Sequence, residues 1–251
     1  MFGTLAAIMT TIENNLGQIH ARIAAACVKA GRAVTSVQLL AVSKTFGVEA
    51  VRDAVLAGQR SFGENYIQEA VDKIAAVRAM HLSGGEALQW HCIGPIQSNK
   101  TRLVAENFDW AQTVDRLKTA ERLSAQRPEG LAPLNVCLQV NVDGGETKSG
   151  VAPDQALELA RAIVALPRLV LRGVMSIPDD APGFEAQCAV HEKAAAVFDA
   201  IKASGLPGLA QFDTLSMGMT GDLEAAVAAG STMVRVGSGV FGGRTYRTST
   251  P

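Results

Sequence analysis

Aromatic residues are scarce in this chain of 251 residues, and its charges almost cancel. Phe, Trp and Tyr together make up 5% of the sequence, and the formal net charge is −1. Proteins that bind nucleic acids usually carry a basic surface, and those that bind single strands add aromatic rings on which bases stack. The composition shows neither feature, so we expect no nucleic-acid partner.

The sequence also lacks a long apolar run and any close pair of cysteines. No stretch is long and apolar enough for a membrane span, and the first fifteen residues carry Glu13 but no basic cluster of a signal peptide. The four histidines show no ligand spacing, so we expect no metal site and no membrane contact. The four cysteines lie far apart in the sequence, at Cys27, Cys92, Cys137 and Cys188. This wide separation favours reduced thiols and a cytoplasmic location for the protein.

What the sequence does contain is a regular alternation of strand-like and helix-like segments. Eight apolar segments are typical of strands: 37–42, 61–63, 88–94, 108–114, 134–142, 169–177, 212–216 and 232–237. Helical patterns separate them, including those at 48–58, 66–80, 154–166, 184–204 and 221–229. A further helix ahead of the first strand is indicated by apolar residues at helical spacing, Ile12, Leu16, Ile19 and Ile23.

This alternation over about 250 residues predicts an α/β fold, a single (β/α)₈ TIM-type barrel with an extra N-terminal helix. No Pro-rich or Gly/Ser-rich linker divides the chain. We therefore expect one domain over 1–251, with the N-terminal helix at about 4–31, the barrel at about 37–244 and a short C-terminal tail. The alternative is an open doubly wound sheet, which usually carries G-x-G-x-x-G after its first strand, where this chain has "SKTFG".

Candidate functional residues follow the strands, because barrel active sites lie at the carboxyl ends of the strands. The first strand runs directly into Ser43, Lys44 and Thr45. The last two strands are followed by "SMGMTGD" (216–222) and "VGSGVFGG" (236–243). Small residues let backbone N–H groups approach an anion, and loops seven and eight are the usual phosphate site of this fold. Ordinary tight turns are the alternative, but two such loops together favour phosphate binding.

A lysine across the barrel mouth from a phosphate site suggests that Lys44 holds a phosphorylated carbonyl compound as a Schiff base. Burial lowers the pKa of a lysine in general and so frees its amine to react. Two alternatives stay open on the residues alone. Lys44 could form an ion pair with Glu64 or another carboxylate at the rim, or it could serve an aldolase that uses no cofactor.

Seven segments resemble, in order from about residue 38 to 244, the YggS/PROSC family of pyridoxal-phosphate-binding homeostasis proteins. They are "LLAVSKT", "FGENYIQEAVDK", "WHCIGPIQSNK", "VNVDGGETKSG", "RGVMSIP", "LSMGMTGDLEAAVAAGSTMVRVG" and "FGGR". The chain departs from the family pattern at Cys92, at Thr220 and in the 179–183 loop. The resemblance implies a barrel similar to the N-terminal domain of alanine racemase, with pyridoxal 5′-phosphate as its cofactor.

The resemblance also assigns roles to particular residues. Lys44 matches the family lysine that forms the covalent aldimine, and Arg235 matches the arginine presented to the pyridine nitrogen. The phosphate cradle would consist of Ser216, Thr220 and the backbone of Gly237 and Ser238. Positions that line the cofactor pocket are matched by Asn65, His91 and Met175. Lys148, in "GGETKSG", is either a secondary acceptor of the aldehyde or a solvated loop lysine.

An arginine at the ring nitrogen argues against turnover. A guanidinium is always charged and keeps that nitrogen unprotonated, which makes the ring a poorer electron sink. A racemase also needs a second base, commonly a tyrosine from a separate C-terminal domain. This sequence ends soon after its barrel, and neither Tyr66 nor Tyr246 is well placed.

Our interpretation is a monomeric, non-catalytic carrier or buffer of pyridoxal phosphate in vitamin B6 homeostasis. Its transient partners would be pyridoxal-phosphate-dependent apoenzymes. The alternative is a small cofactor-dependent amino-acid racemase, and residual activity of that kind is compatible with the residues.

Overall fold

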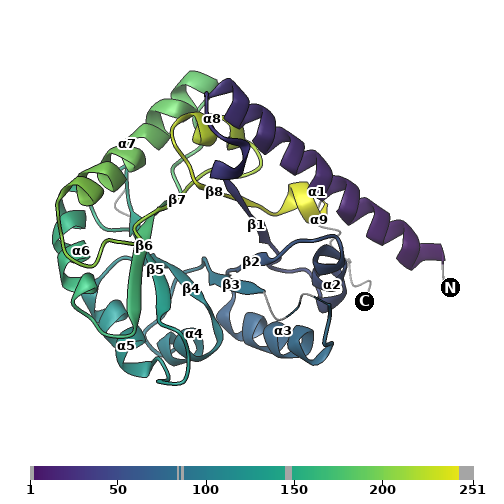
Figure 1. Ribbon diagram of the computed structural model, residues 1–251, viewed down its shortest axis with the longest axis horizontal. Coiled ribbons are helices and arrows are strands. Elements are labelled where there is room, and N and C mark those ends of the chain that lie inside the picture. The colour runs from purple at the N-terminus through teal and green to yellow at the C-terminus, as the bar shows by residue number, and fades with distance from the viewer. Residues whose placement is uncertain (1–2, 84, 86–87, 145–148, 243–251) are drawn as a thin grey trace, which may run out of the picture.

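Eight parallel strands close into a barrel in the computed structural model, which describes residues 3–83, 85, 88–144 and 149–242 (Figure 1). Each strand pairs with the next along the chain, and β1 and β8 close the ring. The expected fold and all eight expected strands are confirmed. The strands are β1 (Gln38–Val42), β2 (Ser61–Glu64), β3 (Gln89–Cys92), β4 (Trp110–Val114), β5 (Leu134–Val140), β6 (Leu169–Ser176), β7 (Thr214–Ser216) and β8 (Met233–Val236).

Helices follow the strands and surround the barrel, as Figure 1 shows. They are α1 (Gly3–Lys29), α2 (Val48–Leu56), α3 (Ile67–Ala79), α4 (Thr101–Asn107), α5 (Leu117–Gln126), α6 (Ala156–Val164), α7 (Phe184–Ala203), α8 (Leu223–Ala228) and α9 (Ser238–Phe241). Short 3₁₀ turns occur at η1 (Val34–Ser36) and η3 (Pro153–Gln155). None of the helices within the described part of the chain has the length and apolar character needed to cross a membrane.

The strands are apolar because both of their faces are covered, one by the barrel interior and the other by helices. The main apolar core lies between the strands and the surrounding helices. The barrel interior holds two smaller apolar clusters. Leu40, Val42, Ile93 and Met233 form one cluster, and Trp110, Cys137 and Met175 form the other. Gln112 links the two clusters, since its Nε2 lies 3.1 Å from Met233 Sδ and 2.9 Å from Nδ1 of His91, whose ring stacks on Trp110.

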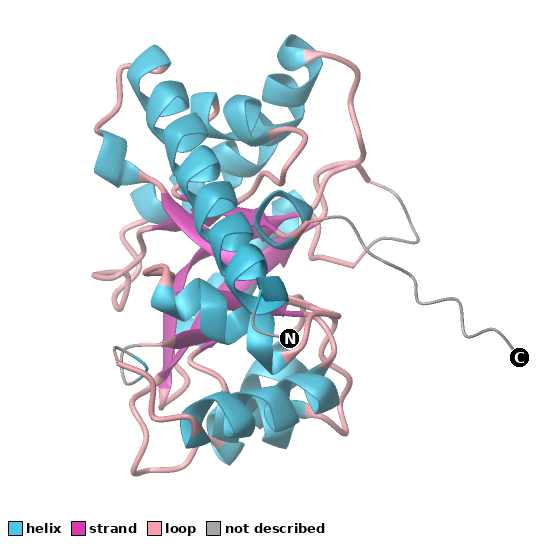
Figure 2. Ribbon diagram, turned by 90° about the vertical axis from the view of Figure 1, so that its right-hand side faces the viewer, coloured by secondary structure: helices cyan, strands magenta, loops and turns pink. Residues whose placement is uncertain are grey.

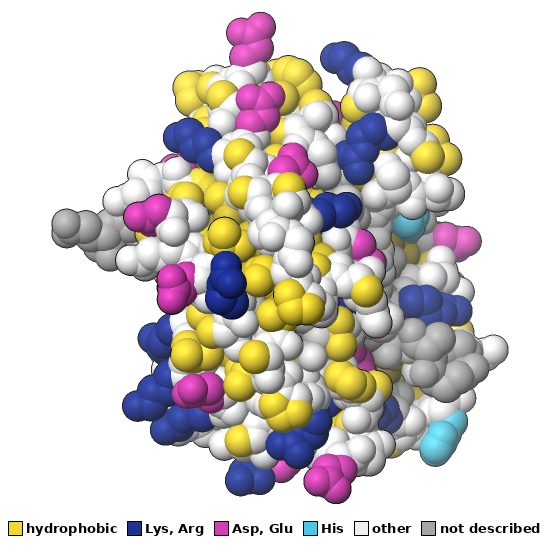
Figure 3. All heavy atoms as spheres, turned by 60° about the vertical axis from the view of Figure 1, so that its left-hand side comes forward, with side chains coloured by type: hydrophobic (Ala, Val, Ile, Leu, Met, Phe, Trp, Pro, Cys, Tyr) yellow, Lys and Arg dark blue, Asp and Glu magenta, His cyan; other side chains and the backbone are white. Residues whose placement is uncertain are grey.

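The helix α1 packs along the outside of the barrel against α2, α8 and α9 (Figure 2). Its predicted apolar stripe is buried, since Ile12, Leu16, Ile19 and Ile23 are each 3–4% exposed. The surface visible in Figure 3 carries acidic and basic side chains interspersed, without a large area of one sign.

Candidate functional site

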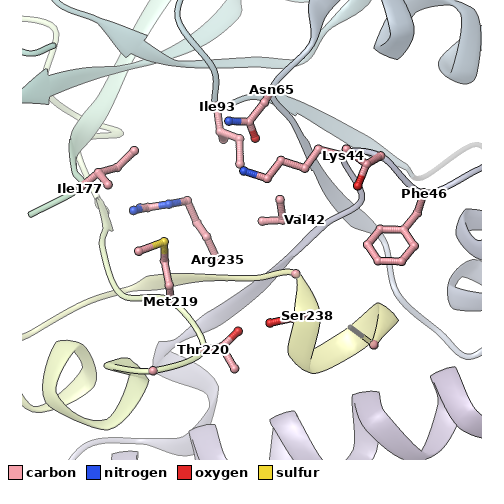
Figure 4. A pocket seen from close by; sticks show the side chains of 14 residues that line it. Val42, Lys44, Phe46, Asn65, Ile93, Ile177, Met219, Thr220, Arg235 and Ser238 are labelled. Carbon is pink, nitrogen blue, oxygen red and sulfur yellow. The ribbon is translucent and has the colours of Figure 1, made fainter. Parts of the chain in front are cut away.

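A cavity of about 340 Å³ opens at the carboxyl ends of the strands (Figure 4). This volume lies within the range of small-molecule binding sites. Its walls come mainly from the segments that follow β1, β2, β3, β6, β7 and β8. The lining residues are Val42, Lys44, Thr45, Phe46, Asn65, Ile93, Ile177, Met219, Thr220, Gly221, Arg235, Gly237, Ser238 and Gly242.

Lys44 enters this cavity two residues after the end of β1. Figure 4 shows its half-buried side chain extended toward Asn65 and Ile93. The next residue, Thr45, has a φ of 68°, a left-handed conformation that costs a non-glycine residue about 1–2 kcal/mol. Such strain persists where the surrounding contacts enforce it, and it is common at functional sites. The backbone at Lys44 is therefore held in place by its neighbours.

Glu64 at the end of β2 is fully buried. It forms an ion pair with Lys73 of α3. Lys73 Nζ lies 2.7 Å from Glu64 Oε1, which also accepts from the hydroxyl of Ser43 at 2.6 Å. Burial raises the pKa of Glu64, while the positive charge of Lys73 and the hydrogen bonds to the carboxylate act to lower it. The structure therefore gives Glu64 a different ion-pair partner from the one considered on the sequence.

A second set of polar groups, here called the anion cradle, comprises Thr220, Gly221, Gly237 and Ser238. The hydroxyls of Thr220 and Ser238 point toward one another in Figure 4. Ser238 begins α9, and N–H groups in the first turn of a helix have no acceptor within that helix. Hydroxyls that face one another beside a helix start with unbonded N–H groups form a site suited to an anion.

The helix α1 fixes the cradle from outside the barrel. Asn15 Nδ2 donates to the carbonyl of Val240 in α9 at 3.0 Å, and Arg22 Nη2 donates to the carbonyl of Thr220 at 3.0 Å. Arg22 also forms two hydrogen bonds with Glu224 in α8, at 2.8 and 2.9 Å. Both loops that supply the cradle are thus attached to the same helix.

Arg235 of β8 is the buried cation of the cavity, with 4% of its surface exposed. Its Nη1 donates to Ser216 Oγ at 2.8 Å, and its Nη2 donates to the carbonyl of Ser176 at 2.8 Å. Burial lowers the pKa of Arg235 to about 10, so the guanidinium remains charged near neutral pH. Figure 4 shows its head turned toward Ile177 and Met219.

A chain of hydrogen bonds runs from Arg235 into the barrel. Ser216 Oγ accepts from Arg235 and donates to Gln112 Oε1 at 2.7 Å. Gln112 Nε2 then lies 2.9 Å from Nδ1 of His91. Burial and the positive charge of Arg172 lower the pKa of His91 to about 3, so the ring is neutral and Nδ1 accepts this bond. The orientation of Arg235 is therefore set by side chains that lie below the cavity.

The structure brings six of the nine predicted site residues to the cavity wall: Lys44, Asn65, Thr220, Arg235, Gly237 and Ser238. His91, Met175 and Ser216 are fully buried beneath it, so direct contact between these three and a cofactor stays a prediction. Eight further lining residues were not among the nine: Val42, Thr45, Phe46, Ile93, Ile177, Met219, Gly221 and Gly242. All eight belong to segments quoted in the sequence analysis, but nothing in those segments distinguishes a lining residue from its neighbours.

Other candidates lie away from the cavity or outside the described residues. Tyr66 is 56% exposed and does not line the cavity. Lys148 and Tyr246 fall outside the residues that the structure describes. Within the described ranges, no group of three or more His, Cys, Asp or Glu side chains is arranged to hold a metal ion.

The barrel is that of the alanine racemase N-terminal domain, whose family model matches residues 15–245. The chain is 53% identical over 238 residues to the pyridoxal phosphate homeostasis protein of Vibrio cholerae, covering 95% of this chain and 98% of that protein. It is 48% identical to the Escherichia coli protein of the same name, with 95% and 99% coverage. This chain therefore belongs to the family of pyridoxal phosphate homeostasis proteins.

A solved structure of PipY from Synechococcus elongatus, with pyridoxal phosphate bound, has a similar fold. The two proteins are 33% identical, and the comparison covers 92% of this chain and all of the other with a TM-score of 0.78.

Proposed function

We propose that this protein binds pyridoxal 5′-phosphate through a Schiff base on Lys44 and acts as a carrier or buffer of the cofactor. The observation that supports this most directly is the opposition of Lys44 and the anion cradle across one cavity of about 340 Å³. The names of the relatives and the cofactor bound to PipY support the same ligand.

The cavity offers a partner to each reactive part of the cofactor. The amine of Lys44 would condense with the aldehyde and release one water molecule. The hydroxyls and amides of the anion cradle suit the phosphate, and the guanidinium of Arg235 suits the ring nitrogen. Asn65 Oδ1 is buried and has no hydrogen-bond partner among the described residues, so it is available to accept from the ring hydroxyl.

The same residues favour binding over turnover. A pKa of about 10 keeps Arg235 charged, and a charged guanidinium leaves the ring nitrogen unprotonated and the ring a poor electron sink. No tyrosine is among the described residues that line the cavity. Burial also raises the pKa of Cys92 and of Cys137 to about 12, so neither thiol would serve as the second base of a racemase.

Absorption spectroscopy before and after borohydride tests the Schiff base. The wild-type protein with pyridoxal phosphate should show a yellow band that borohydride bleaches, and Lys44→Ala should lack it. Lys118→Ala, which removes an exposed lysine of α5, is the matched control and should keep the band. A wild type that stays colourless with added cofactor would refute the proposal and favour an aldolase-like lysine.

Hydrogen exchange distinguishes the carrier from a racemase. The loaded protein is incubated with L-alanine in D₂O, and loss of the α-proton signal is followed by NMR. We expect no exchange above that of free pyridoxal phosphate. Exchange that depends on Lys44 would identify an enzyme instead.

Delivery and assembly need separate measurements. Loaded protein is mixed with the apo form of a pyridoxal-phosphate-dependent enzyme, together with a phosphatase that destroys free cofactor. Direct delivery predicts that the enzyme regains activity, and no recovery would restrict the protein to buffering.

We also expect a monomer, so light scattering should give a mass near 26.3 kDa.

A further inference from the structure

A buried network of charged side chains lies directly beneath the loop that carries Lys44. Its centre is Lys73 of α3, whose side chain is 4% exposed, paired with Glu64, whose side chain is 0% exposed. Of the ion pairs between described residues, this one is the most deeply buried. All three Nζ protons of Lys73 have acceptors, because Nζ lies 2.7 Å from Glu64 Oε1, 2.9 Å from the carbonyl of Ser43 and 3.3 Å from Glu69 Oε1.

The network contacts the residues on both sides of Lys44. On the N-terminal side, Lys73 binds the carbonyl of Ser43, and the Ser43 hydroxyl donates to Glu64. On the C-terminal side, the amide of Thr45 donates to Glu69 Oε1 at 3.3 Å. One ammonium group therefore restrains the residue before Lys44 directly and the residue after it through Glu69.

Stability alone does not explain this arrangement. Moving two charges out of water costs several kcal/mol per ion, and apolar residues of similar volume often serve a core equally well. The hydrogen bonds of this pair also converge on one loop. That loop contains the left-handed Thr45, whose conformation needs such restraint.

We propose that Glu64 and Lys73 are positioning residues, which hold the loop so that the amine of Lys44 enters the cavity at the angle needed for Schiff-base formation. This inference rests on the proposed function. It implies that loss of the pair weakens attack on the aldehyde and leaves the phosphate and ring-nitrogen contacts intact, because the anion cradle and Arg235 belong to β7, β8 and the segments after them.

Comparing two ligands distinguishes a positioning role of the pair from a role in general stability. Pyridoxal phosphate can form the Schiff base, whereas pyridoxine 5′-phosphate carries an alcohol in place of the aldehyde and can use only the phosphate and ring contacts. Lys73→Met and Glu64→Gln should each slow formation of the borohydride-reducible adduct by about ten-fold to a hundred-fold, since a misplacement near 1 Å costs that much. The dissociation constant of pyridoxine phosphate should stay within about three-fold of wild type, because its phosphate and ring-nitrogen contacts are kept.

Glu69→Ala provides a variant that does not endanger folding, because this side chain is 44% exposed. It removes only the bond to Thr45 and one bond of Lys73, so we expect adduct formation to slow by about two-fold to ten-fold. Lys100→Met is the matched control: its ammonium donates to Gln68 Oε1 at 3.2 Å and forms no hydrogen bond with the Lys44 loop within the described part of the chain, so adduct formation should be unchanged.

The outcomes are distinct. Equal losses of affinity for both ligands would show a merely structural role, and unchanged adduct formation in all three network variants would overturn the inference. A wild type that forms no reducible adduct would instead refute the proposed function.

Discussion

Gly218 should tolerate no side chain, because it sits in a left-handed turn against a helix. It follows β7 in the segment that leads to the anion cradle, and its φ is 91°. A Cβ added there would lie 2.3 Å from the Cβ of Ala226, a fully buried residue of α8. The carbonyl of Gly218 accepts a hydrogen bond from the amide of Arg235 at 2.9 Å, so movement of this turn would also disturb β8.

The cost of Gly218→Ala can be estimated from two effects. A left-handed conformation costs alanine about 1–2 kcal/mol, and overpacking in a filled core costs about 1–3 kcal/mol. The obstructing atom is a Cβ that no rotamer change can move, so the turn itself must shift. The free energy of unfolding should therefore fall by about 2–5 kcal/mol, out of the roughly 5–15 kcal/mol typical of a folded protein.

Urea denaturation measures this loss, and titration with pyridoxine 5′-phosphate measures the accompanying damage to the anion cradle. Gly221→Ala is the control from the same segment, since its φ is not left-handed and an added Cβ would meet nothing within 4 Å. We expect the control to change the unfolding free energy by less than about 0.5 kcal/mol. A loss equally small for Gly218→Ala would refute the packing argument.

Three further predictions follow from charges and burial. Arg22→Ala removes the bond to the Thr220 carbonyl and should weaken binding of pyridoxine phosphate by about two-fold to ten-fold in calorimetry; unchanged affinity would mean that α1 does not support the cradle. Burial acts to raise the pKa of Asp222, but hydrogen bonds from His191 and a backbone amide outweigh it and hold that pKa below 3.8. The carboxylate therefore contributes stability above pH 3.8 that is lost as pH falls through its folded pKa, and Asp222→Asn should flatten the acid side of the unfolding free-energy curve. Parallel curves for the two proteins would contradict this. A thiol reagent should react in the native protein with Cys188 at most, and with all four cysteines after denaturation, because the buried thiols are Cys27, Cys92 and Cys137.

The strands could be predicted well because a parallel strand covered on both faces appears as a continuous apolar segment. An apolar segment does not, however, show at which residue the strand begins or ends. The seventh strand was expected from residue 212, but β7 begins at Thr214, since Phe212 is buried by stacking on Phe198 and not by pairing in the sheet. The short α9 was missed because four residues between glycines are too few to show a helical period.

The site was predictable as a place in the fold and less so residue by residue. Strand ends identify the barrel mouth, but they do not say whether a side chain lines the cavity or points below it. Ser216 ends β7 and His91 lies in β3, and both face the interior beneath the cavity. The burial of Lys73 could not be predicted from the sequence, because a lysine in a helical pattern usually lies on the surface. Only the tertiary fold places it against Glu64.

The helix α1 shows how one sequence pattern can specify both the fold and the support of the site. Asn15 and Arg22 are seven residues apart, so they lie on the same side of the helix, about 10 Å apart along its axis. Ile12 and Ile19 have the same spacing and are buried against the barrel. The register that buries this apolar stripe therefore also aims Asn15 at α9 and Arg22 at the Thr220 loop. Changing that register would displace both halves of the anion cradle together, which makes the extra helix part of the framework of the candidate site.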